Sequence, residues 1–278
     1  MRISAATSQR LAVSLMWLLT IITLGVLLFI IVFILAKGLP HVTWTFLTSA
    51  PKAMGREGGV LPMIIGTIWV AGLGVLIAAP IGVATAVCLT EYTREGKLTA
   101  VIRFGADCLA GVPSIIFGLF GFVFFVTVLK MGFSIIAGAL TLALMVLPTV
   151  IRTSEEAIRA VPKSYRDVTF GLGATRWQMV TRVVLHSALP GIVTGIVLSI
   201  GRCVSETAAL MLTSGSVLGL PRSAADPART LSLHFYILSR EGLSMPKAYA
   251  TAAVLIISIL GINVTAYWLM RRFIGRKA

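Results

Sequence analysis

Charged residues are scarce in this sequence of 278 residues. Asp, Glu, Lys and Arg together make up 12% of it, whereas a soluble globular domain carries about 25%. Hydrophobic residues account for 57%, and the mean hydropathy is +0.96. These values exclude a soluble domain and predict an integral membrane protein.

Cysteine and histidine are also rare, and neither type is clustered. The three cysteines, Cys88, Cys108 and Cys203, lie in apolar stretches and have no Cys-x-x-Cys spacing. We therefore expect them to be small core residues. The three histidines are scattered along the chain. Neither a metal site nor a cofactor is expected.

Catalytic motifs are missing as well. The sequence has no G-x-x-x-x-G-K-[ST] loop to bind nucleotide phosphates, and no G-x-S-x-G or H-E-x-x-H motif. This argues against the alternative of a membrane enzyme. If ATP drives this protein, the hydrolysis must come from a partner.

Long apolar runs are what the sequence has instead. About 20 apolar residues suffice to cross a bilayer as a helix, and the first run exceeds the roughly 7–15 apolar residues of a signal peptide. The sequence predicts an all-α integral membrane protein with one six-span domain, 11–270, between tails of residues 1–10 and 271–278. The predicted spans are 11–36, 60–90, 104–129, 131–151, 183–212 and 248–270.

Basic residues are divided unevenly between the loops. Six spans place both termini on one side, where the tails and loops contain two, three, six and four Lys or Arg, fifteen in all, against eight on the other side. Because cytoplasmic loops are enriched in Lys and Arg, we expect both termini and loop 152–182 in the cytoplasm, and loop 213–247 outside it. The net charge of +14 is then a topology signal, and no nucleic-acid partner is expected.

The longest polar segment on the predicted cytoplasmic side, residues 152–190, has helical periodicity. An ordinary solvated loop that happens to be helical is one interpretation. We favour a docking element, because an exposed apolar stripe needs something to cover it. The apolar residues recur three and four positions apart, on one helix face: Ile158, Val161, Tyr165, Val168 and Leu172.

Turn and capping residues divide this segment into two helices. Pro162 suits the first turn of a helix, where the N–H that it lacks would be unpaired anyway. Gly171 and Gly173 interrupt the helix, and Thr175 begins the next one as a Thr-x-x-Gln capping box with Gln178. The sequence predicts a short amphipathic helix, a glycine turn and a second helix.

The same segment resembles the EAA loop of ABC importer permeases, whose pattern is E-A-A, three residues, G, nine residues and I-x-L-P. Asp167, Val168 and Thr169 stand at the E-A-A positions. Gly173 is the glycine, and His186 replaces the closing proline. In that family the loop forms a coupling helix that sits in a groove of a cytoplasmic ATPase subunit. The resemblance implies the type I ABC importer permease fold and assigns ATPase coupling to Tyr165, Asp167, Val168, Thr169, Leu172 and Gly173.

Charged residues also lie inside predicted spans. Arg202 and Glu206 are four positions apart in the fifth span, hence on one helix face. An arginine at the middle of a span costs about 2.5–3.5 kcal/mol on translocon scales. An intrahelical ion pair that only fixes helix contacts is one interpretation; we favour the substrate pathway, because intramembrane ionisable residues usually mark such pathways. Asp107, near the end of the third span, is expected to be structural.

A second resemblance concerns the substrate. The run G-R-C-V-S-E-T-A-A-L from Gly201 is similar to the G-R-A-x-G-E-T stretch in the membrane subunits of phosphate ABC importers, and Arg202, Glu206 and Thr207 match it. The runs G-V-P-S-I-I-F-G-L-F-G and L-G-A-T-R-W-Q also look like those subunits. Chain length and the extracytoplasmic segment favour the PstA type over its PstC-type partner.

This resemblance implies roles for four charged residues. The planar guanidinium of Arg202 matches an oxyanion such as phosphate. Glu206 would compete with the substrate for Arg202, so that binding stays weak enough for release. Arg152 and Glu155, at the cytoplasmic end of the fourth span, receive a lesser exit-side role, because the matching positions of the phosphate family are charged. Anchoring at the membrane interface is an equal alternative for these two.

The expectation is therefore a multi-pass permease subunit of the bacterial inner membrane. The resemblance implies a homologous second permease, two cytoplasmic ATPase subunits, an extracytoplasmic phosphate-binding protein, inorganic phosphate and membrane lipid as partners. Alternatives are the PstC-type subunit or a permease for another oxyanion, such as sulfate or molybdate. A self-contained secondary transporter is the rival from another class, and it predicts inverted repeats with broken helices at the midplane.

Overall fold

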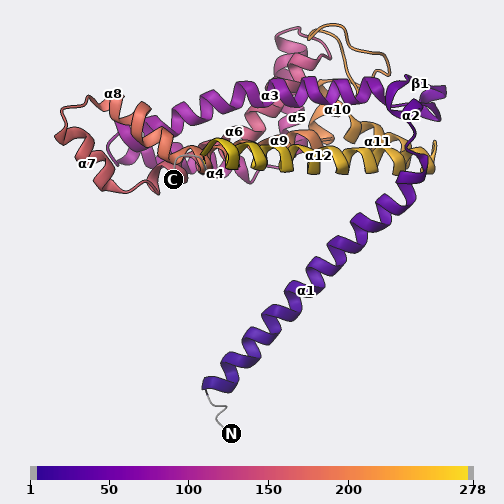
Figure 1. Ribbon diagram of the computed structural model, residues 1–278. Helices are drawn as coiled ribbons and strands as arrows, with labels where there is room; N and C mark the ends of the chain where they lie inside the picture. Colours follow the sequence, from indigo (N-terminus) through magenta and orange to yellow (C-terminus); the bar gives the residue numbers. More distant parts are fainter. Residues whose placement is uncertain (1–4, 275–278) are drawn as a thin grey trace.

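The computed structural model describes residues 5–274, so the ends of both predicted tails, 1–4 and 275–278, lie outside the described residues. Most of the chain is helical (Figure 1). Five helices are long and apolar enough to cross a membrane, and a sixth crossing is possible if one bent pair counts as a span. The five are α1 (Ala5–Gly38), α3 (Leu61–Val87), α6 (Ile135–Arg159), α9 (Leu185–Ser205) and α12 (Met245–Ile274).

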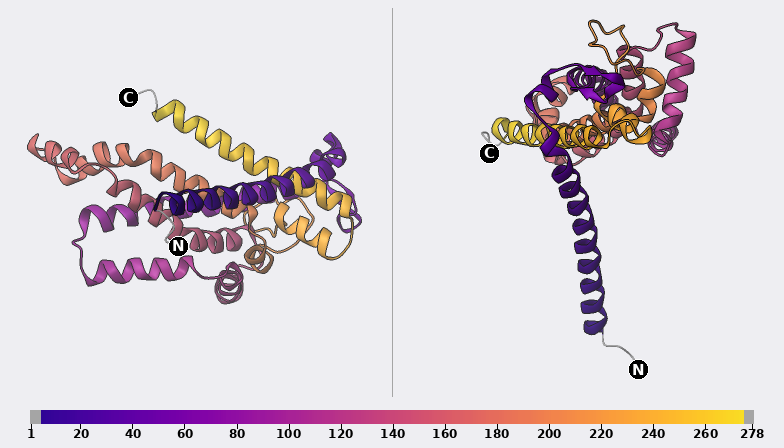
Figure 2. Two further views of the ribbon diagram at one scale, coloured as in Figure 1. Left: turned by 90° about the horizontal axis from the view of Figure 1, so that it is seen from below. Right: turned by 90° about the vertical axis from the view of Figure 1, so that its right-hand side faces the viewer.

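The first span stands apart from the others. α1 leaves the bundle at an angle and packs on it mainly through its carboxyl-terminal turns, against α12 (Figures 1 and 2). There the ring of Phe33 meets that of Tyr249 edge to face, with centroids 6.0 Å apart. A helix that is apolar all round must be covered by lipid or protein. The other described residues leave nearly all of residues 9–36 uncovered.

The third span is not the continuous helix that the sequence predicts. α4 (Lys97–Ala110) and α5 (Ser114–Gly121) are bent by 101° across residues 111–113. Pro113 lacks the N–H that a continuing helix needs and disfavours the helical conformation of the residue before it. α5 then continues as η4 (Phe122–Val128), a π-helical segment. A sharply bent pair of helices therefore stands in place of the third predicted span, and α4 begins seven residues earlier than expected.

The boundaries of the fourth and fifth spans also differ from prediction. α6 starts after Ser134, whose hydroxyl accepts from the amide of Ala137. α6 continues past residue 151, where the predicted span ends, to Arg159. The charged residues in this last part form ion pairs, so they do not interrupt the helix. The fifth span is helical from α8 (Arg176–Met179) through η5 (Val180–Val184) and α9, and it breaks after Ser205. α10 (Ala208–Thr213) follows the break.

Small elements form the end of the bundle opposite α8 (Figure 1). Between α1 and α3 lie η1 (Leu39–His41), α2 (Trp44–Thr48), η2 (Ala53–Gly55) and a two-residue hairpin, in which β1 (Pro51–Lys52) pairs antiparallel with β2 (Glu57–Gly58). The predicted loop 213–247 contains a helix, α11 (Leu231–Arg240), whose side chains Leu231, Leu233 and His234 are buried. This connection is therefore packed structure rather than a free loop.

The core runs along α3, α6 and α9, and α6 lies between the other two. Leu142, Met145 and Val146 of α6 are almost fully buried there, together with Cys203 of α9. The prediction of core cysteines is right for Cys203 and wrong for Cys88 and Cys108, which are exposed. Cys88 is the first residue of η3 (Cys88–Tyr92), and Cys108 belongs to α4.

Candidate substrate pathway and coupling site

The predicted helix, glycine turn and helix are present at one end of the bundle (Figure 1). α7 (Lys163–Gly171) begins directly after Pro162, and α8 begins after Thr175. Gly173 has φ +78°, a conformation that favours glycine. The hydroxyl of Thr175 accepts from the amide of Gln178 at 3.3 Å, and the Gln178 amide oxygen accepts from the amide of Thr175 at 2.9 Å. The local prediction from turn and capping residues is confirmed.

The predicted apolar stripe is divided between two helices. Ile158 belongs to α6, and both it and Val161 are buried in a core cluster with Met179 and Val184. Only the remaining three members are exposed: Tyr165 by 50%, Val168 by 62% and Leu172 by 83%. The stripe was predicted as one face of one helix, and this is wrong because α6 extends to Arg159.

The three exposed members define the apolar face of α7: Tyr165, Val168 and Leu172. Phe170 and Trp177 are large apolar side chains that are also exposed nearby in the chain. Asp167 is exposed, and the hydroxyl of Thr169 donates to the carbonyl of Tyr165 at 2.5 Å. Among the described residues, nothing covers this face, since α7 has no buried residue at all.

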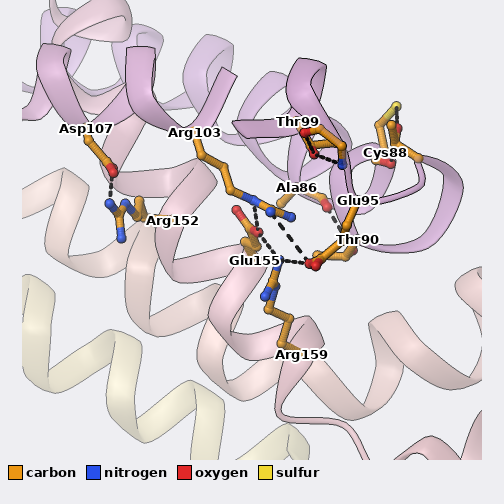
Figure 3. A network of polar contacts seen from close by, with 12 residues as sticks. Ala86, Cys88, Thr90, Glu95, Thr99, Arg103, Asp107, Arg152, Glu155 and Arg159 are labelled. Carbon is orange, nitrogen blue, oxygen red and sulfur yellow. Dashed lines mark hydrogen bonds and ion pairs between the residues drawn. The ribbon is translucent and has the colours of Figure 1, made fainter. Parts of the chain in front are cut away.

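Charged residues of α4 and α6 form a cluster near the same end of the bundle (Figure 3). Arg103 Nε donates to Glu155 Oε1 at 2.7 Å, and Arg159 Nη2 lies 3.0 Å from the same oxygen. Arg152 forms an ion pair with Asp107. Glu155 is 7% exposed, so its charge is compensated almost entirely by Arg103 and Arg159. The cluster therefore ties α4 to α6.

A cavity of about 280 Å³ lies within this cluster, bordered by Arg103, Asp107, Arg152, Glu155, Glu156 and Arg159. Arg103 Nη2 is buried and has no hydrogen-bond partner among the described residues. An unpaired buried donor is costly and leaves a place for another acceptor. The cluster can thus hold two helices together and can also offer a donor to an oxygen-rich ligand.

The structure brings Arg152 and Glu155 into this cluster together with Arg159 of α6 and two residues of α4, none of which was assigned to it from the sequence. Arg103 of α4 lies just outside the predicted third span, 104–129, and Asp107 was expected to be structural. Both lie on α4 at a spacing of four, opposite Arg152 and Glu155 of α6. Arg103 and Asp107 are four positions apart, as on one helix face. A prediction that α4 begins at Lys97 would have placed both on one helix, available to pair with α6.

The predicted pairing of Arg202 with Glu206 on one helix face is wrong. Arg202 lies in the last turn of α9, but Glu206 is already extended, with φ −70° and ψ 133°. Its carboxylate accepts from the amides of Thr207 at 3.2 Å and Ala209 at 3.1 Å. Glu206 thus caps α10 by satisfying its first free N–H groups. Arg202 forms no ion pair within the described residues.

Arg202 and the α4–α6 cluster stand at two levels of the bundle. α6 and α9 are antiparallel, with Gly195 against Thr153 and Gly191 against Ala157. Because a helix rises about 1.5 Å per residue, Arg202 lies roughly 10 Å farther from α7 along the bundle than Thr153 does. The resemblance gave Arg152 and Glu155 a role at the cytoplasmic exit, apart from Arg202, and the two sets of charges do lie apart along the bundle.

Comparison with known proteins agrees with this architecture. Residues 78–278 match the family described as binding-protein-dependent transport system inner membrane component. A probable ABC transporter permease protein of Bacillus subtilis, YqgI, is 34% identical over 281 aligned residues, covering 94% of this chain and 95% of that protein. The phosphate transport system permease protein PstA of Haemophilus influenzae is 32% identical over 93% of this chain and 92% of its own length.

Solved structures show the same fold. The membrane chain of a bacterial alginate ABC transporter superposes with a TM-score of 0.72 at 17% identity, covering 96% of both chains. A chain of the methionine transporter MetNI gives a TM-score of 0.64 at 20% identity over 74% of this chain and 92% of that one. The fold is the type I ABC importer permease fold. The chain belongs to the family of binding-protein-dependent transport system inner membrane components, the multi-pass permease subunits of ABC importers, which work with ATPase and binding-protein partners.

Proposed function

We propose that this chain is the PstA-type permease of an ATP-driven phosphate importer. It forms half of the translocation pathway, and a homologous second permease forms the other half. Two cytoplasmic ATPase subunits supply the energy, and an extracytoplasmic phosphate-binding protein delivers the substrate. Relatives named as phosphate permeases, including PstA 1 of Mycobacterium tuberculosis at 35% identity over 88% of this chain, support phosphate as the substrate.

The observation that carries the proposal is Arg202. It lies within the membrane-spanning helix α9 and forms no ion pair in the described part of the chain. A guanidinium without a counter-ion is unfavourable inside a membrane, and phosphate is an anion whose oxygens match its planar donors. A passing phosphate would supply the missing charge. Glu206, held at the start of α10, sets a negative charge nearby and keeps the affinity of Arg202 for the anion low.

The cluster of Arg152 and Glu155 suits a later step of the passage. Arg152 forms an ion pair with Asp107, and Arg103 and Arg159 both form ion pairs with Glu155. Phosphate leaving toward the cytoplasm would displace Asp107 from Arg152. Arg103, whose Nη2 has no hydrogen-bond partner among the described residues, borders the same cavity. The ion pairs then close the exit again once the anion has left.

The coupling site is the apolar face of α7. Tyr165, Val168 and Leu172 are exposed in this chain, although apolar groups gain stability when they are covered. Docking of an ATPase would cover them, with Asp167 and Thr169 at the edge of the contact and Gly173 allowing the chain to turn back. This arrangement requires α7, both termini and the α4–α6 cluster to lie on the cytoplasmic side.

Phosphate uptake by cells that carry Arg202 variants tests the proposal. We expect Arg202→Gln to assemble normally and lose uptake, because glutamine lacks the positive charge. Arg202→Lys should recover part of the uptake, since it restores the charge without the planar donors. Arg240→Gln, which changes an exposed arginine of α11, is the matched control. Full uptake with Arg202→Gln would contradict the proposal that an anion passes this residue.

A further inference from the structure

α7 is held to the rest of the chain with little help from apolar packing. None of its residues is buried. A cavity of about 630 Å³ separates it from the end of α3, bordered by Asp167 and Phe170 on the α7 side and by Thr90 and Glu95 on the other. If α7 is a docking helix, its movement can reach α3 only through the polar contacts that join the two.

One side chain of α7 crosses to the end of α3. Arg166 Nη2 lies 2.6 Å from Glu91 Oε1, and Arg166 Nε donates to the same oxygen at 3.0 Å and to Oε2 at 3.3 Å. The side chains of Arg166 and Glu91 are 18% and 7% exposed. A fork of two donors on one carboxylate fixes direction as well as distance. The pair therefore holds α7 at a defined orientation to α3.

The same guanidinium also reaches the end of α6. Arg166 Nη2 donates to the carbonyl of Ile158 at 3.0 Å, and Nη1 donates to that of Val161 at 2.8 Å. These carbonyls are at the carboxyl end of α6, where a helix lacks intrahelical donors and favours a positive charge. Arg166 thus joins three elements: α7, the end of α6 and the end of α3.

A local distortion of α3 presents Glu91 to Arg166. Glu91 lies in η3, a π-helical turn of the kind that recurs at functional sites. The next residue of that turn, Tyr92, has the guanidinium of Arg176 over its ring, 5.9 Å from the centroid, within the range of a cation–π contact. Arg176 is the first residue of α8. Two adjacent residues of η3 therefore contact the two helices on either side of the Gly173 turn.

We propose that the Glu91–Arg166 ion pair, with Tyr92 and Arg176 as a second contact, is the joint through which displacement of α7 moves α3. The proposal rests on the proposed function, in which α7 docks on an ATPase. α3 packs along α6 and contacts α9, the helix of Arg202. A displacement of η3 would therefore move α3 and, through it, the helices that carry the proposed substrate pathway. Glu91 and Arg166 are positioning residues. Neither belongs to the apolar face of α7 that docks on the ATPase, and neither touches the substrate.

The test uses the full complex of both permeases and ATPases in proteoliposomes, with the binding protein added. ATP hydrolysis, phosphate uptake and the amount of ATPase retained on purification are measured for Glu91→Gln, Arg166→Lys and Lys163→Gln. Lys163 is an exposed residue of α7 that forms no ion pair in the described part of the chain, and its variant is the matched control.

We expect Glu91→Gln to retain the ATPase and its hydrolysis but to lower phosphate transported per ATP hydrolysed by about tenfold, the factor that corresponds to one lost charge-assisted hydrogen bond. Arg166→Lys keeps the charge and loses the fork, so it should fall between Glu91→Gln and the unmodified complex. Lys163→Gln should match the unmodified complex. A residue that only stabilised the fold would lower uptake and hydrolysis together.

If Glu91→Gln leaves the phosphate transported per ATP hydrolysed unchanged, the proposal that this ion pair is the joint is wrong. If that variant does not accumulate, Arg166→Lys decides in the same way. Two other results would contradict the proposed function separately from the joint. ATPase retained by Leu172→Asp would show that another surface docks, and no phosphate uptake by the unmodified complex would contradict the proposed substrate. In the latter case, stimulation of ATP hydrolysis by the binding protein reports on the joint, and Glu91→Gln should abolish that stimulation.

Discussion

Among the arginines of α4, α6 and α9, Arg202 differs from Arg103, Arg152 and Arg159, each of which forms an ion pair with a carboxylate. Removing a charge from water without compensation costs several kcal/mol or shifts its protonation. A paired guanidinium can be explained by the helix contacts that it fixes. Arg202 has no ion pair in the described part of the chain, and a transient anionic partner is the explanation that we propose for it.

Another buried polar group makes a prediction about pH. His234 of α11 is buried beside Arg229, whose Nη1 lies 3.4 Å from His234 Nδ1. Burial, together with the nearby positive charge, lowers the pKa of His234 to about 4. Below its ordinary pKa of about 6.5 the unfolded chain binds a proton that the folded chain does not, so folding stability falls as the pH drops from about 6.5 toward 4.

The loss should be about 2 kcal/mol at pH 5 relative to pH 7.5. It can be measured as a lower melting temperature of the detergent-purified protein. His234→Gln cannot bind the proton and should remove this part of the pH dependence, whatever it does to stability at pH 7.5. An equal drop in melting temperature with and without His234 would contradict the assignment.

A charge within a predicted span indicated Arg202 as a functional candidate, and the resemblance to phosphate importers added Arg152 and Glu155. The partners of these residues could not be predicted in the same way. The i,i+4 rule assumes an unbroken helix, and Glu206 fails it because its carboxylate caps α10 instead. Glu91 directly follows the predicted second span, 60–90, and nothing in the sequence pattern singled it out. Its role depends on the π-helical turn η3, which has no distinct hydrophobic period, and on a partner 75 residues away.

At the scale of elements, α7 provides the sharpest prediction. Val168→Asp and Leu172→Asp place a charge on its apolar face, and that charge would have to be buried in the docked complex. Burying a polar group without a partner costs about 1–3 kcal/mol in proteins, about 5- to 150-fold in affinity. Less ATPase should therefore co-purify with either variant, while membrane insertion is unchanged.

Met54→Asp serves as the control, because Met54 is exposed and belongs to η2, at the opposite end of the bundle. Gly173→Ala tests the turn: its Cβ would have open space, so any loss comes from the positive φ, about 1–2 kcal/mol. Normal ATPase binding by Val168→Asp and Leu172→Asp would mean that another surface docks.

The number and type of elements could be predicted more readily than where the helices break. Apolar length identified every long spanning helix, and capping residues identified the α7–α8 turn. The breaks at residues 111–113 and 206–207 interrupt runs that remain apolar on both sides, so hydropathy does not register them. Helix breaks also belong to what a secondary transporter predicts, so they do not separate the two classes, whereas the sequence and fold of this chain are those of ABC importer permeases.

At the scale of the whole molecule, the orientation in the membrane remains a prediction of charge distribution. The carboxyl end of α12 lies at the same end of the bundle as α7 and α8, and α2 and α11 lie at the other end (Figures 1 and 2). A reporter enzyme that is active only outside the cytoplasm should be inactive when fused after Gly173 and active when fused after Gly242. The reverse pattern would invert the proposed pathway and place α7 where no ATPase could reach it.

The central claim is that this chain conducts phosphate only as part of an ATP-driven complex. The direct measurement is uptake of labelled phosphate by proteoliposomes that contain this chain, its partner permease and the ATPase, with the binding protein outside and ATP inside. We predict uptake that requires both ATP and the binding protein, and that excess phosphate competes away while sulfate and molybdate do not. Uptake by this chain without the ATPase, or transport of sulfate in place of phosphate, would contradict the account.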